Sequence, residues 1–501
     1  MHQRRTRTGL RAGIAAALAA FVLVMTGGAA QAAQPVVEAG AQPAAVVQPQ
    51  AAEGKTFTIG TDTAFAPFDY ADPNSGEITG IDIDMIRAVA EAEGFKVEIK
   101  PMGFQPAVTA LDSGQVDGVI AGMSITPERK KTFDFSTPYY KSGIAMAVDQ
   151  DSDIASFEDM KGKTAIAKNG SEGLTTGEEL GKKYGFKMSS IEGSQALHDA
   201  VTSGQYAAVF DDLPVLQYAA AQGKGLKLVG DPKPAGDYGF AVKKGKNADL
   251  LAGFNSGLEK IKANGKYQSI LDQYLKNPET ASSSKGTIVD LAVSSWPALS
   301  KGLVNTLTVT LAAFVLALVL GLVFGMLKIT NSRVLRGIAS VYVAVFRGTP
   351  LLVWAFFFYF GLPQVTGWRI DSFTAGMLAL GLNAGAYLTE ILRGSVQAVD
   401  PGQLEAARSL GLGWGKSMQR VVIPQAIKIA TPSIINQFVI TLKDSSLLLA
   451  ITYGELLFEA QRLAGANYRM TEMLIIVGVI YFVVITLLTW VANIVDKKVN
   501  K

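Results

Sequence analysis

The 501-residue sequence contains no cysteine and only two histidines, His2 and His198. The absence of cysteine excludes disulfide bonds, thiolate catalysis, cysteine-ligated zinc and lipid attachment through an N-terminal cysteine. The two histidines are far apart in the chain and offer no pair around which to build a site. We therefore expect no metal ion.

The sequence also lacks a marked excess of one charge. It has 46 Lys and Arg against 43 Asp and Glu, which gives no argument for a nucleic-acid partner. A nucleotide-binding loop is missing as well. The segment Gly415-Lys416-Ser417 has the end of a phosphate-binding loop, but the glycine required five positions before Gly415 is replaced by Leu410. We expect no cofactor on this chain, and any ATP must be used by a separate subunit.

Apolar residues, by contrast, are abundant. They make up 49% of the chain, which together with its length predicts several domains, some of them in a bilayer. The first segment has arginines between positions 4 and 11, an apolar run at 13–26 and the exit Ala30-Gln31-Ala32. This pattern is typical of a secretory signal peptide cleaved after about Ala32, while an uncleaved anchor would give the same outward topology.

Composition divides the chain into five segments. Residues 1–32 are the predicted signal peptide, and 33–54, rich in Ala, Pro, Val and Gln, form a predicted disordered linker. Residues 55–277 form an extracytoplasmic domain, 278–298 a second linker, and 299–501 a transmembrane domain.

In the extracytoplasmic domain, short β-like runs alternate with amphipathic helices. Examples are 56–60, 81–94 and 96–100, a pattern that predicts layered α/β structure with largely parallel sheets. Such sheets bind ligands beyond the carboxyl ends of their strands. The chain passes through 143–148 and again through 238–242, which suggests two lobes joined by two strands.

Five apolar stretches of the C-terminal part are each close to the ~20 residues that a helix needs to cross a bilayer. They are residues 303–327, 338–362, 372–393, 431–453 and 473–495. If the signal exports the α/β domain, Lys and Arg concentrate in the loops on the inner side, as the positive-inside rule requires. We therefore expect a multi-pass protein of the bacterial plasma membrane.

One inner loop carries a spaced motif. It consists of Glu405, Ala406, Ala407, Gly411 and Pro424, with apolar residues at 421 and 423. The motif resembles the E-A-A-x3-G-x9-I-x-L-P loop of ABC importer permeases, which implies a short coupling helix that fits a groove of an ABC ATPase subunit. Small alanines allow close approach of a partner, and Gly411 can end the helix with a positive φ. The alternative is an ordinary solvated helical hairpin.

The α/β domain resembles the solute-binding proteins for polar amino acids, in particular the glutamine and the histidine or lysine-arginine-ornithine groups. The likeness depends on segments 61–68, 80–84, 121–129 and 134–140. It implies a two-lobed periplasmic-binding-protein-like (type II) α/β domain, followed here by an all-α transmembrane permease domain of about five helices.

A free amino acid brings two full charges that each need a counter-charge in the cleft. Arg129 is the candidate for the α-carboxylate, because a guanidinium can pair both oxygens. The resemblance implies Asp212 for the α-ammonium, completed by Ser124 and the carbonyl of Gly122. As an alternative, Arg129 belongs to a solvated basic run with its two neighbouring lysines.

Phe65 and Phe104 are expected to enclose the ligand side chain, although they could also be ordinary core residues. For the far end of the ligand, the resemblance carries over Asp62, Lys168 and Ser171. The sequence departs from the glutamine-binding pattern in having Glu172 at a usually small position and Asp211 where histidine is found. These extra carboxylates could favour a cationic side chain, so glutamine and a basic amino acid both stay open.

The segments 346–352 and 442–447 also resemble permeases of this group. Charged and polar groups within spans are costly and tend to face a partner or a watery cavity. We therefore expect some residues to line the translocation path or, alternatively, to brace the helices around it. These residues are Arg347, Asn383, Glu390, Lys443 and Asp444.

These observations predict the substrate-binding and permease subunit of an ATP-driven importer for polar amino acids, with glutamine favoured or else a basic amino acid. The chain is then not an enzyme. Its partners are a separate ABC ATPase, a second copy of the permease in a homodimer, the membrane and the free amino acid. An amino-acid-gated channel or transmembrane sensor is the alternative, and an enzyme such as a dehydratase is a third possibility.

Overall fold

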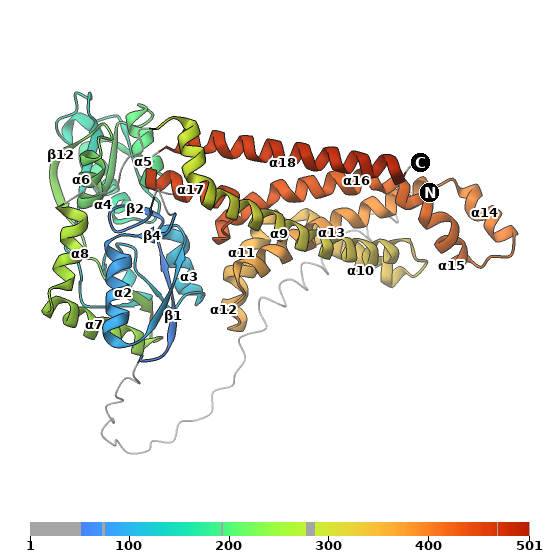
Figure 1. The fold of residues 1–501 in the computed structure, drawn as a ribbon, viewed down its shortest axis with the longest axis horizontal. Helices are drawn as coiled ribbons and strands as arrows, with labels where there is room; N and C mark the ends of the chain where they lie inside the picture. The colour runs from blue at the N-terminus through green and yellow to red at the C-terminus, as the bar shows by residue number, and fades with distance from the viewer. Residues whose placement is uncertain (1–51, 73–75, 192–193, 277–285, 468, 500–501) are drawn as a thin grey trace, which may run out of the picture. The chain divides into compact units, whose positions relative to one another are not determined.

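The computed structural model describes residues 52–72, 76–191, 194–276, 286–467 and 469–499 (Figure 1). The predicted signal peptide, most of the first predicted linker and residues 278–285 of the second lie outside these residues. The rest of the second predicted linker is largely helical, because helix α9 (Ile288–Ile329) begins within it. Contacts divide the chain into two units, which are described separately. One contains residues 316–350 and 382–434, and the other contains the described residues of 49–315, 351–381 and 435–501.

The first lobe of the α/β domain is built on a five-stranded sheet of order β5-β1-β6-β13-β7. Strand β1 runs parallel to β5 and β6, whereas β13 is antiparallel to β6 and β7. The strands are β1 (Thr56–Thr61), β5 (Lys96–Pro101), β6 (Gly118–Val119), β7 (Phe133–Phe135) and β13 (Ala241–Lys243). A small antiparallel sheet contains β2 (Ala64–Phe65), β3 (Asp69–Ala71) and β4 (Ile78–Thr79).

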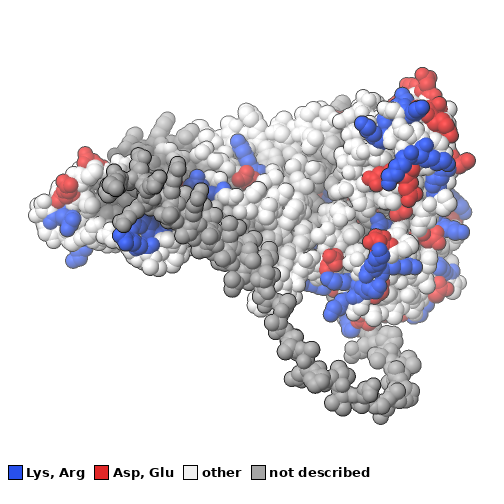
Figure 2. Space-filling model, turned by 180° about the vertical axis from the view of Figure 1, so that it is seen from behind, with Lys and Arg blue, Asp and Glu red and all other residues white. Residues whose placement is uncertain are grey.

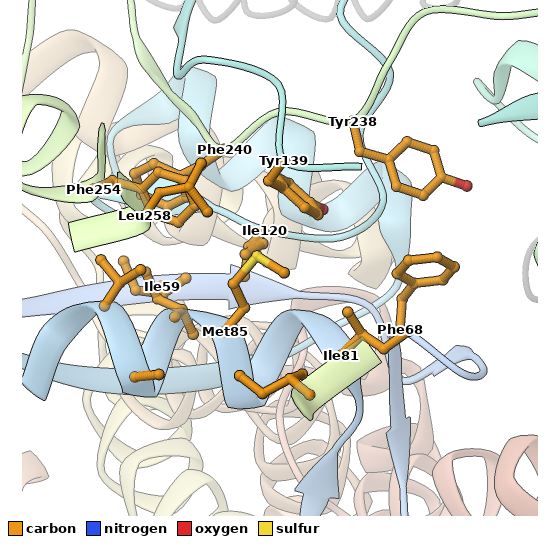
Figure 3. Close-up of a cluster of buried hydrophobic side chains, with 14 of the residues drawn as sticks. Ile59, Phe68, Ile81, Met85, Ile120, Tyr139, Tyr238, Phe240, Phe254 and Leu258 are labelled. Carbon is orange, nitrogen blue, oxygen red and sulfur yellow. The ribbon is translucent and has the colours of Figure 1, made fainter. Parts of the chain in front are cut away.

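Helices cover this lobe and close its core. They are α2 (Ile81–Glu93), α3 (Phe104–Ser113), the 3-10 turn η1 (Arg129–Lys131), α7 (Ala248–Ala263) and α8 (Lys266–Leu275). Figure 3 shows Ile59 of β1 and Met85 of α2 facing Phe254 and Leu258 of α7, all of them buried in one cluster. The apolar period of these helices therefore faces the sheet, as the sequence predicts.

The second lobe has a five-stranded sheet of order β10-β9-β11-β8-β12. Its central strands run parallel, and β8 and β12 are antiparallel to their neighbours. The strands are β8 (Gly143–Asp149), β9 (Thr164–Lys168), β10 (Lys187–Ile191), β11 (Ala208–Asp212) and β12 (Leu226–Pro234). The helices are α4 (Glu172–Tyr184), α5 (Ser194–Thr202) and α6 (Leu213–Ala221), with the 3-10 turn η2 (Glu158–Met160).

The chain crosses between the lobes twice. It leaves the first lobe after β7 and enters the second at β8, then returns from β12 to β13. The two connections pair through an isolated bridge of Tyr238 with Tyr140, and Tyr238 also forms a bridge with Ser124 of the first lobe. The predicted two-lobed α/β domain is therefore confirmed, and the predicted crossing strands lie at the ends of the two connections.

The C-terminal part is helical. Its elements are α9 (Ile288–Ile329), α10 (Arg333–Gly348), α11 (Leu351–Phe356), the π-helical turn η4 (Phe357–Gly361), α12 (Leu362–Thr366), α13 (Ser372–Ala398), α14 (Pro401–Ser409), α15 (Trp414–Ser417), the π-helical turn η5 (Met418–Val422), α16 (Ile423–Asp444), the 3-10 helix η6 (Ser445–Ile451), α17 (Leu456–Asn467) and α18 (Met470–Val499). On the face that Figure 2 shows, charged side chains crowd the α/β domain, whereas the long helices carry few.

Four stretches of the described chain are long and apolar enough to cross a membrane, and a fifth span results if one broken pair of helices is counted as one. The broken pair is α10 with α11 to α12, interrupted at Thr349-Pro350, where proline cannot continue the hydrogen-bond ladder. The prediction of about five helices is confirmed. Helix α9 begins at Ile288, well before the predicted start of the first span at 303.

Two glycines let α9 approach α13 closely within one unit. A Cβ added to Gly321 would lie 2.6 Å from the Cβ of Leu388, and one added to Gly325 would lie 3.3 Å from that of Leu392. Spaced by four residues, the two glycines lie on one helix face and replace side-chain packing with backbone contact. In the same unit, the ring of Tyr342 in α10 stacks on Phe324 with centroids 4.0 Å apart.

This contact predicts that Gly321→Ala destabilises the permease domain, because the new methyl group must displace Leu388 from a close-packed seam. Overpacking of this kind costs about 1–3 kcal/mol. The control is Gly337→Ala in α10, where an added Cβ meets no atom within 4 Å of the described structure. Thermal unfolding of the purified full chain in lipid nanodiscs should show a lower Tm for the first variant alone. Equal stability of the two variants would contradict the seam.

Candidate functional site

The candidate site lies in the cleft between the two lobes of the α/β domain. The first lobe contributes residues that follow β1 and β6, and the second contributes the ends of β9 and β11. The cavity is lined by Phe65, Phe104, Ala121, Gly122, Ser124, Arg129, Lys168, Ser171, Glu172, Asp211 and Asp212. The position beyond the carboxyl ends of the strands is the one predicted for open α/β sheets.

The cavity is nearly closed. Its volume is about 20 Å³, which is enough for about one water molecule and too small for an amino acid. The side chains of Arg129 and Lys168 line this space, and both interact across the cleft. A ligand therefore needs the lobes to separate and then to close around it.

Arg129 faces the cleft, whereas its neighbours Lys130 and Lys131 are exposed. Its guanidinium lies 5.3 Å from the ring centroid of Phe104 and donates to the backbone carbonyl of Ser124 at 2.9 Å. A further bond to the carbonyl of Gly170, at 3.1 Å, joins the first lobe to the second. Burial lowers the pKa of Arg129, and nearby carboxylates oppose this effect. The ordinary pKa of arginine is so high that the group stays charged. It is therefore not part of a solvated basic run.

Asp212 closes β11 and precedes α6, and it is only 6% exposed. One carboxylate oxygen accepts a hydrogen bond from Ser142 at 3.0 Å, and the hydroxyl of Tyr238 lies 3.1 Å from the same Ser142 oxygen. Burial raises the pKa of Asp212, while these hydroxyls and the nearby cations lower it. An α-ammonium group would supply the full positive charge that the two hydroxyls do not.

Asp211 also lines the cavity rather than facing solvent. Its Oδ1 accepts from the backbone nitrogen of Asp212 at 2.9 Å, while its Oδ2 has no hydrogen-bond partner among the described residues. Burial raises its pKa to about 7, although the nearby Lys168 ammonium lowers it. Asp211 is therefore partly protonated near neutral pH and can donate as well as accept.

Lys168 and Asp62 form a buried ion pair across the cleft. Lys168 Nζ lies 2.7 Å from Asp62 Oδ2, with side-chain exposures of 4% and 3%. The ammonium lies 4.5 Å from the ring centroid of Phe65 and 6.0 Å from that of Phe104. Burial acts against the charge, but Asp62 and Asp211 outweigh it and raise the pKa of Lys168. The predicted far-end contacts are thus brought together with the two predicted aromatic walls.

Ser171 is placed by a helix cap. Its Oγ accepts from the backbone nitrogen of Leu174 at 3.2 Å and donates to the carbonyl of Lys168 at 2.8 Å. It thereby begins α4 and fixes the backbone that carries Lys168. Glu172, the next residue, also lines the cavity.

Two buried carboxylates behind the site were not identified from the sequence. Asp69 accepts from Thr61 Oγ1 at 2.7 Å and from the backbone nitrogen of Asp62 at 2.8 Å. Asp82 accepts from the backbone nitrogen of Gly122 at 2.8 Å and from Tyr139 Oη at 2.9 Å. They position the backbone of predicted ligand contacts. The sequence signal for Asp82 was its place in the first turn of an amphipathic helix. An acidic residue there usually marks only a helix start.

The predicted coupling motif forms a helical hairpin. Helix α14 begins after Asp400, whose side chain accepts from Gly402 N at 2.7 Å. Gly411 follows the helix with φ +83°, the left-handed value that the sequence predicts. Of the two alanines, Ala406 is exposed, whereas Ala407 is buried at 5% exposure within its own unit. Only Ala406 is therefore open to close approach by a partner. Glu405 and Pro424 are exposed as well.

The predicted path residues are mostly engaged with neighbouring helices. Arg347 lies 4.7 Å from the ring centroid of Tyr387, and the Asn383 side chain donates to the carbonyl of Phe346 at 2.9 Å. Glu390 pairs with Lys328 of α9 and with Arg393 of its own helix, at 2.8 Å from the latter.

Lys443 is exposed and Asp444 is half-buried. Within the described part of the chain, no ion pair joins these two residues. The contacts of Arg347, Asn383 and Glu390 hold neighbouring helices together.

The Asp82 carboxylate predicts a dependence of stability on pH. Burial raises its pKa from 3.8 to about 7, so the folded state holds the proton more tightly than the unfolded state does. The free energy of unfolding should therefore fall as pH rises from 3.8 towards 7. Asp82→Asn keeps an acceptor for Gly122 and Tyr139 but cannot titrate. Thermal unfolding of the full chain against pH should give a shallower slope for this variant. An unchanged slope would rule out Asp82 as a source of the dependence.

Comparisons with known proteins cover both halves of the chain. Residues 57–277 match the family of bacterial extracellular solute-binding proteins, family 3. Residues 301–501 match the family of binding-protein-dependent transport system inner membrane components.

Individual relatives are similar to one half each. The arginine transport system permease protein ArtQ of Bacillus subtilis is 39% identical over 204 residues, which are 41% of this chain and 93% of that protein. The arginine-binding extracellular protein ArtP of the same organism is 33% identical over 217 residues, 43% of this chain and 84% of that protein. A solved structure of an ancestral arginine-binding protein bound to glutamine is 39% identical, covers 44% of this chain and 97% of its own, and superposes with a TM-score of 0.41.

Proposed function

Since this chain belongs to the amino acid ABC transporters and fuses a family 3 solute-binding domain to an inner-membrane permease domain, we propose that it captures glutamine outside the plasma membrane and delivers it to its own permease. Fusion keeps the receptor at a high effective concentration beside the pathway. Two copies of the permease domain form the pathway, and a separate ABC ATPase supplies the energy.

The buried pair of Lys168 and Asp62 is the observation that supports glutamine. Lys168 lines the cavity, and Asp62 pairs with it, so the two charges balance each other before any ligand enters. A neutral amide satisfies both, because its oxygen accepts from the Lys168 ammonium and its NH2 group donates to Asp62. A cationic side chain would instead meet the fixed positive charge of Lys168 in a dry site, where like charges are costly.

The remaining groups suit the zwitterionic end of the ligand. Arg129 pairs with the α-carboxylate and Asp212 with the α-ammonium, while the methylene groups lie between Phe65 and Phe104. Each charge of the ligand thus receives one counter-charge.

Asp211 and Glu172 are the residues that could still favour a basic ligand. Asp211 is partly neutralised by its raised pKa and interacts with the Lys168 ammonium, and Glu172 interacts with Arg129. The negative charge of each carboxylate is therefore shared with a cation of the site. The names of two relatives mention arginine, but those names describe those proteins. The positive charge of Lys168 argues against arginine as the ligand of this chain.

Replacement of Lys168 by methionine tests the substrate. The variant keeps the apolar stem but removes the ammonium, so glutamine loses its amide partner while Asp62 becomes free for a guanidinium. We expect glutamine affinity to fall about 10-fold or more, since loss of one partner of a buried charged pair costs 2–5 kcal/mol. The ratio of arginine to glutamine affinity should rise. Isothermal titration of the full chain in nanodiscs with L-glutamine and L-arginine measures both.

Two controls accompany this experiment. Arg129→Ala should weaken both ligands alike, because both carry the same α-carboxylate, whereas Lys161→Met, an exposed lysine of the same lobe, should change neither. Tighter binding of L-arginine than of L-glutamine by the wild-type chain would overturn the proposed substrate.

A substitution on the exposed face of α14 tests the proposed contact with the ATPase subunit. Ala406→Arg places a long charged side chain where a close contact is expected, and the residue is exposed, so the hairpin should still fold. We expect loss of copurification with the native ATPase subunit and loss of glutamine-stimulated ATP hydrolysis, with glutamine binding retained. Gln419→Arg, also exposed and in the following turn η5, is the control. Full ATPase activity with Ala406→Arg would exclude this face as the coupling contact.

A further inference from the structure

Tyr238 lies in the connection that returns the chain from the second lobe to the first. Its backbone nitrogen donates to the carbonyl of Tyr140 at 2.8 Å, and its carbonyl accepts from Tyr139 N at 2.9 Å. It is bridged in the same way to Ser124, a predicted ligand contact of the first lobe. The residue is fully buried, with 0% exposure. Its backbone is thus tied to both connecting segments and to the rim of the first lobe.

The Tyr238 hydroxyl is linked to the carboxylate of the second lobe. Three oxygens cluster there, because Ser142 Oγ lies 3.0 Å from Asp212 Oδ1 and 3.1 Å from Tyr238 Oη. Ionised Asp212 can only accept, so Ser142 donates to it, and the Tyr238 hydroxyl can donate to Ser142 Oγ in turn. Ser142 thereby joins Tyr238 to Asp212. Hydrogen bonds to a charged group are among the stronger ones in proteins.

The Tyr238 ring packs against the aromatic wall of the site. Its centroid lies 5.1 Å from that of Phe68, 5.6 Å from that of Tyr140 and 6.3 Å from that of Phe65. In Figure 3, Phe68 lies next to the Tyr238 ring, while the Tyr238 hydroxyl points away from Tyr139 and from the core of the first lobe. The ring therefore belongs to the first lobe, and the hydroxyl extends towards the second.

Two-lobed domains open and close through changes in the few residues that connect the lobes. Asp212 sits at the end of β11 in the second lobe, whereas the ring and backbone of Tyr238 are held by the first. Separation of the lobes must therefore strain or break the link between them. The link is a feature of the closed arrangement, together with the pair of Lys168 and Asp62.

We propose that Tyr238 is a positioning residue that couples occupation of Asp212 by the ligand ammonium to closure of the two lobes. This inference rests on the proposed capture of an amino acid. An ammonium that docks on Asp212 holds the carboxylate in its ionised form and in place, which strengthens the link to Tyr238 through Ser142 and favours the closed connection. The ligand then stabilises closure through Tyr238 as well as through its direct contacts with both lobes.

The test uses Tyr238→Phe, which keeps the stacked ring and removes only the hydroxyl. The chain has no cysteine, so two introduced cysteines can carry a fluorophore pair without background labelling. Lys266→Cys in the first lobe and Lys183→Cys in the second are both exposed sites. Single-molecule energy transfer on the full chain in nanodiscs reports the closed fraction as L-glutamine is added.

We expect Tyr238→Phe to raise the glutamine concentration needed for half-closure about 10-fold or more, as loss of a hydrogen bond in a network that ends on a charged group predicts. The closed fraction at saturation should also fall. Tyr140→Phe is the matched control, since its ring stacks on Tyr238 in the same cluster. It should close like the wild type. A glutamine analogue without the α-amino group, 4-carbamoylbutanoic acid, should lose much less affinity through Tyr238→Phe than L-glutamine does.

The outcomes separate the two proposals. If the wild-type chain neither binds nor closes with L-glutamine, the proposed function fails. If the wild type closes and Tyr238→Phe closes at the same glutamine concentration, the role of Tyr238 is wrong. Equal losses for L-glutamine and the deamino analogue would also overturn it, because they would indicate a purely structural effect. Should Tyr238→Phe unfold, Ser142→Ala removes the other hydroxyl of this cluster. It must raise the glutamine concentration needed for half-closure as well, by a smaller factor.

Discussion

The structure of the binding domain depends on how it keeps charges in a dry cleft. Asp211 and Asp212 converge with Arg129 and Lys168 in a cavity that holds about one water, and Asp62 pairs with Lys168. Unpaired, each of these groups would shift its pKa or open the cleft. Pairing across the lobes avoids this, because Lys168 meets Asp62 and Arg129 meets the carbonyl of Gly170. In the proposed function a ligand shares these pairs, which makes closure sensitive to the ligand's own charges.

Behind these groups, further polar residues hold the site in shape. Asp69 fixes the backbone of Asp62, and Asp82 fixes that of Gly122, so the positions of predicted ligand contacts depend on residues that do not line the cavity. Tyr238 belongs to the same class, because it holds Asp212 through Ser142 from the connection between the lobes. Such supporting bonds explain how a site made of loops can be geometrically defined.

The permease domain follows a different constraint. Lipid offers no hydrogen bonds, so every backbone group must be paired within a helix, and polar side chains must find partners in the bundle. Glu390 with Lys328 and Asn383 with the carbonyl of Phe346 obey this rule. Helix α9 approaches α13 through Gly321 and Gly325, where packing between backbones takes the place of a hydrophobic driving force. These contacts arrange the helices, and the charged α14–α15 hairpin is left to the aqueous phase.

The amino-acid sequence by itself determined the division into an α/β domain and about five apolar helices, because the periods of apolar residues and the lengths of apolar runs are local properties. It also predicted Arg129 as a ligand contact from its chemistry and, through the family resemblance, Lys168 and Asp62. Only the tertiary structure decided that Asp211 faces the cavity, that Ala407 is buried and that α9 begins at Ile288. The role of Asp82 likewise depends on contacts with Gly122 and Tyr139, which are 40 and 57 residues away. The role of Tyr238 depends on its contact with Ser142, 96 residues away. No local pattern encodes which distant groups will meet.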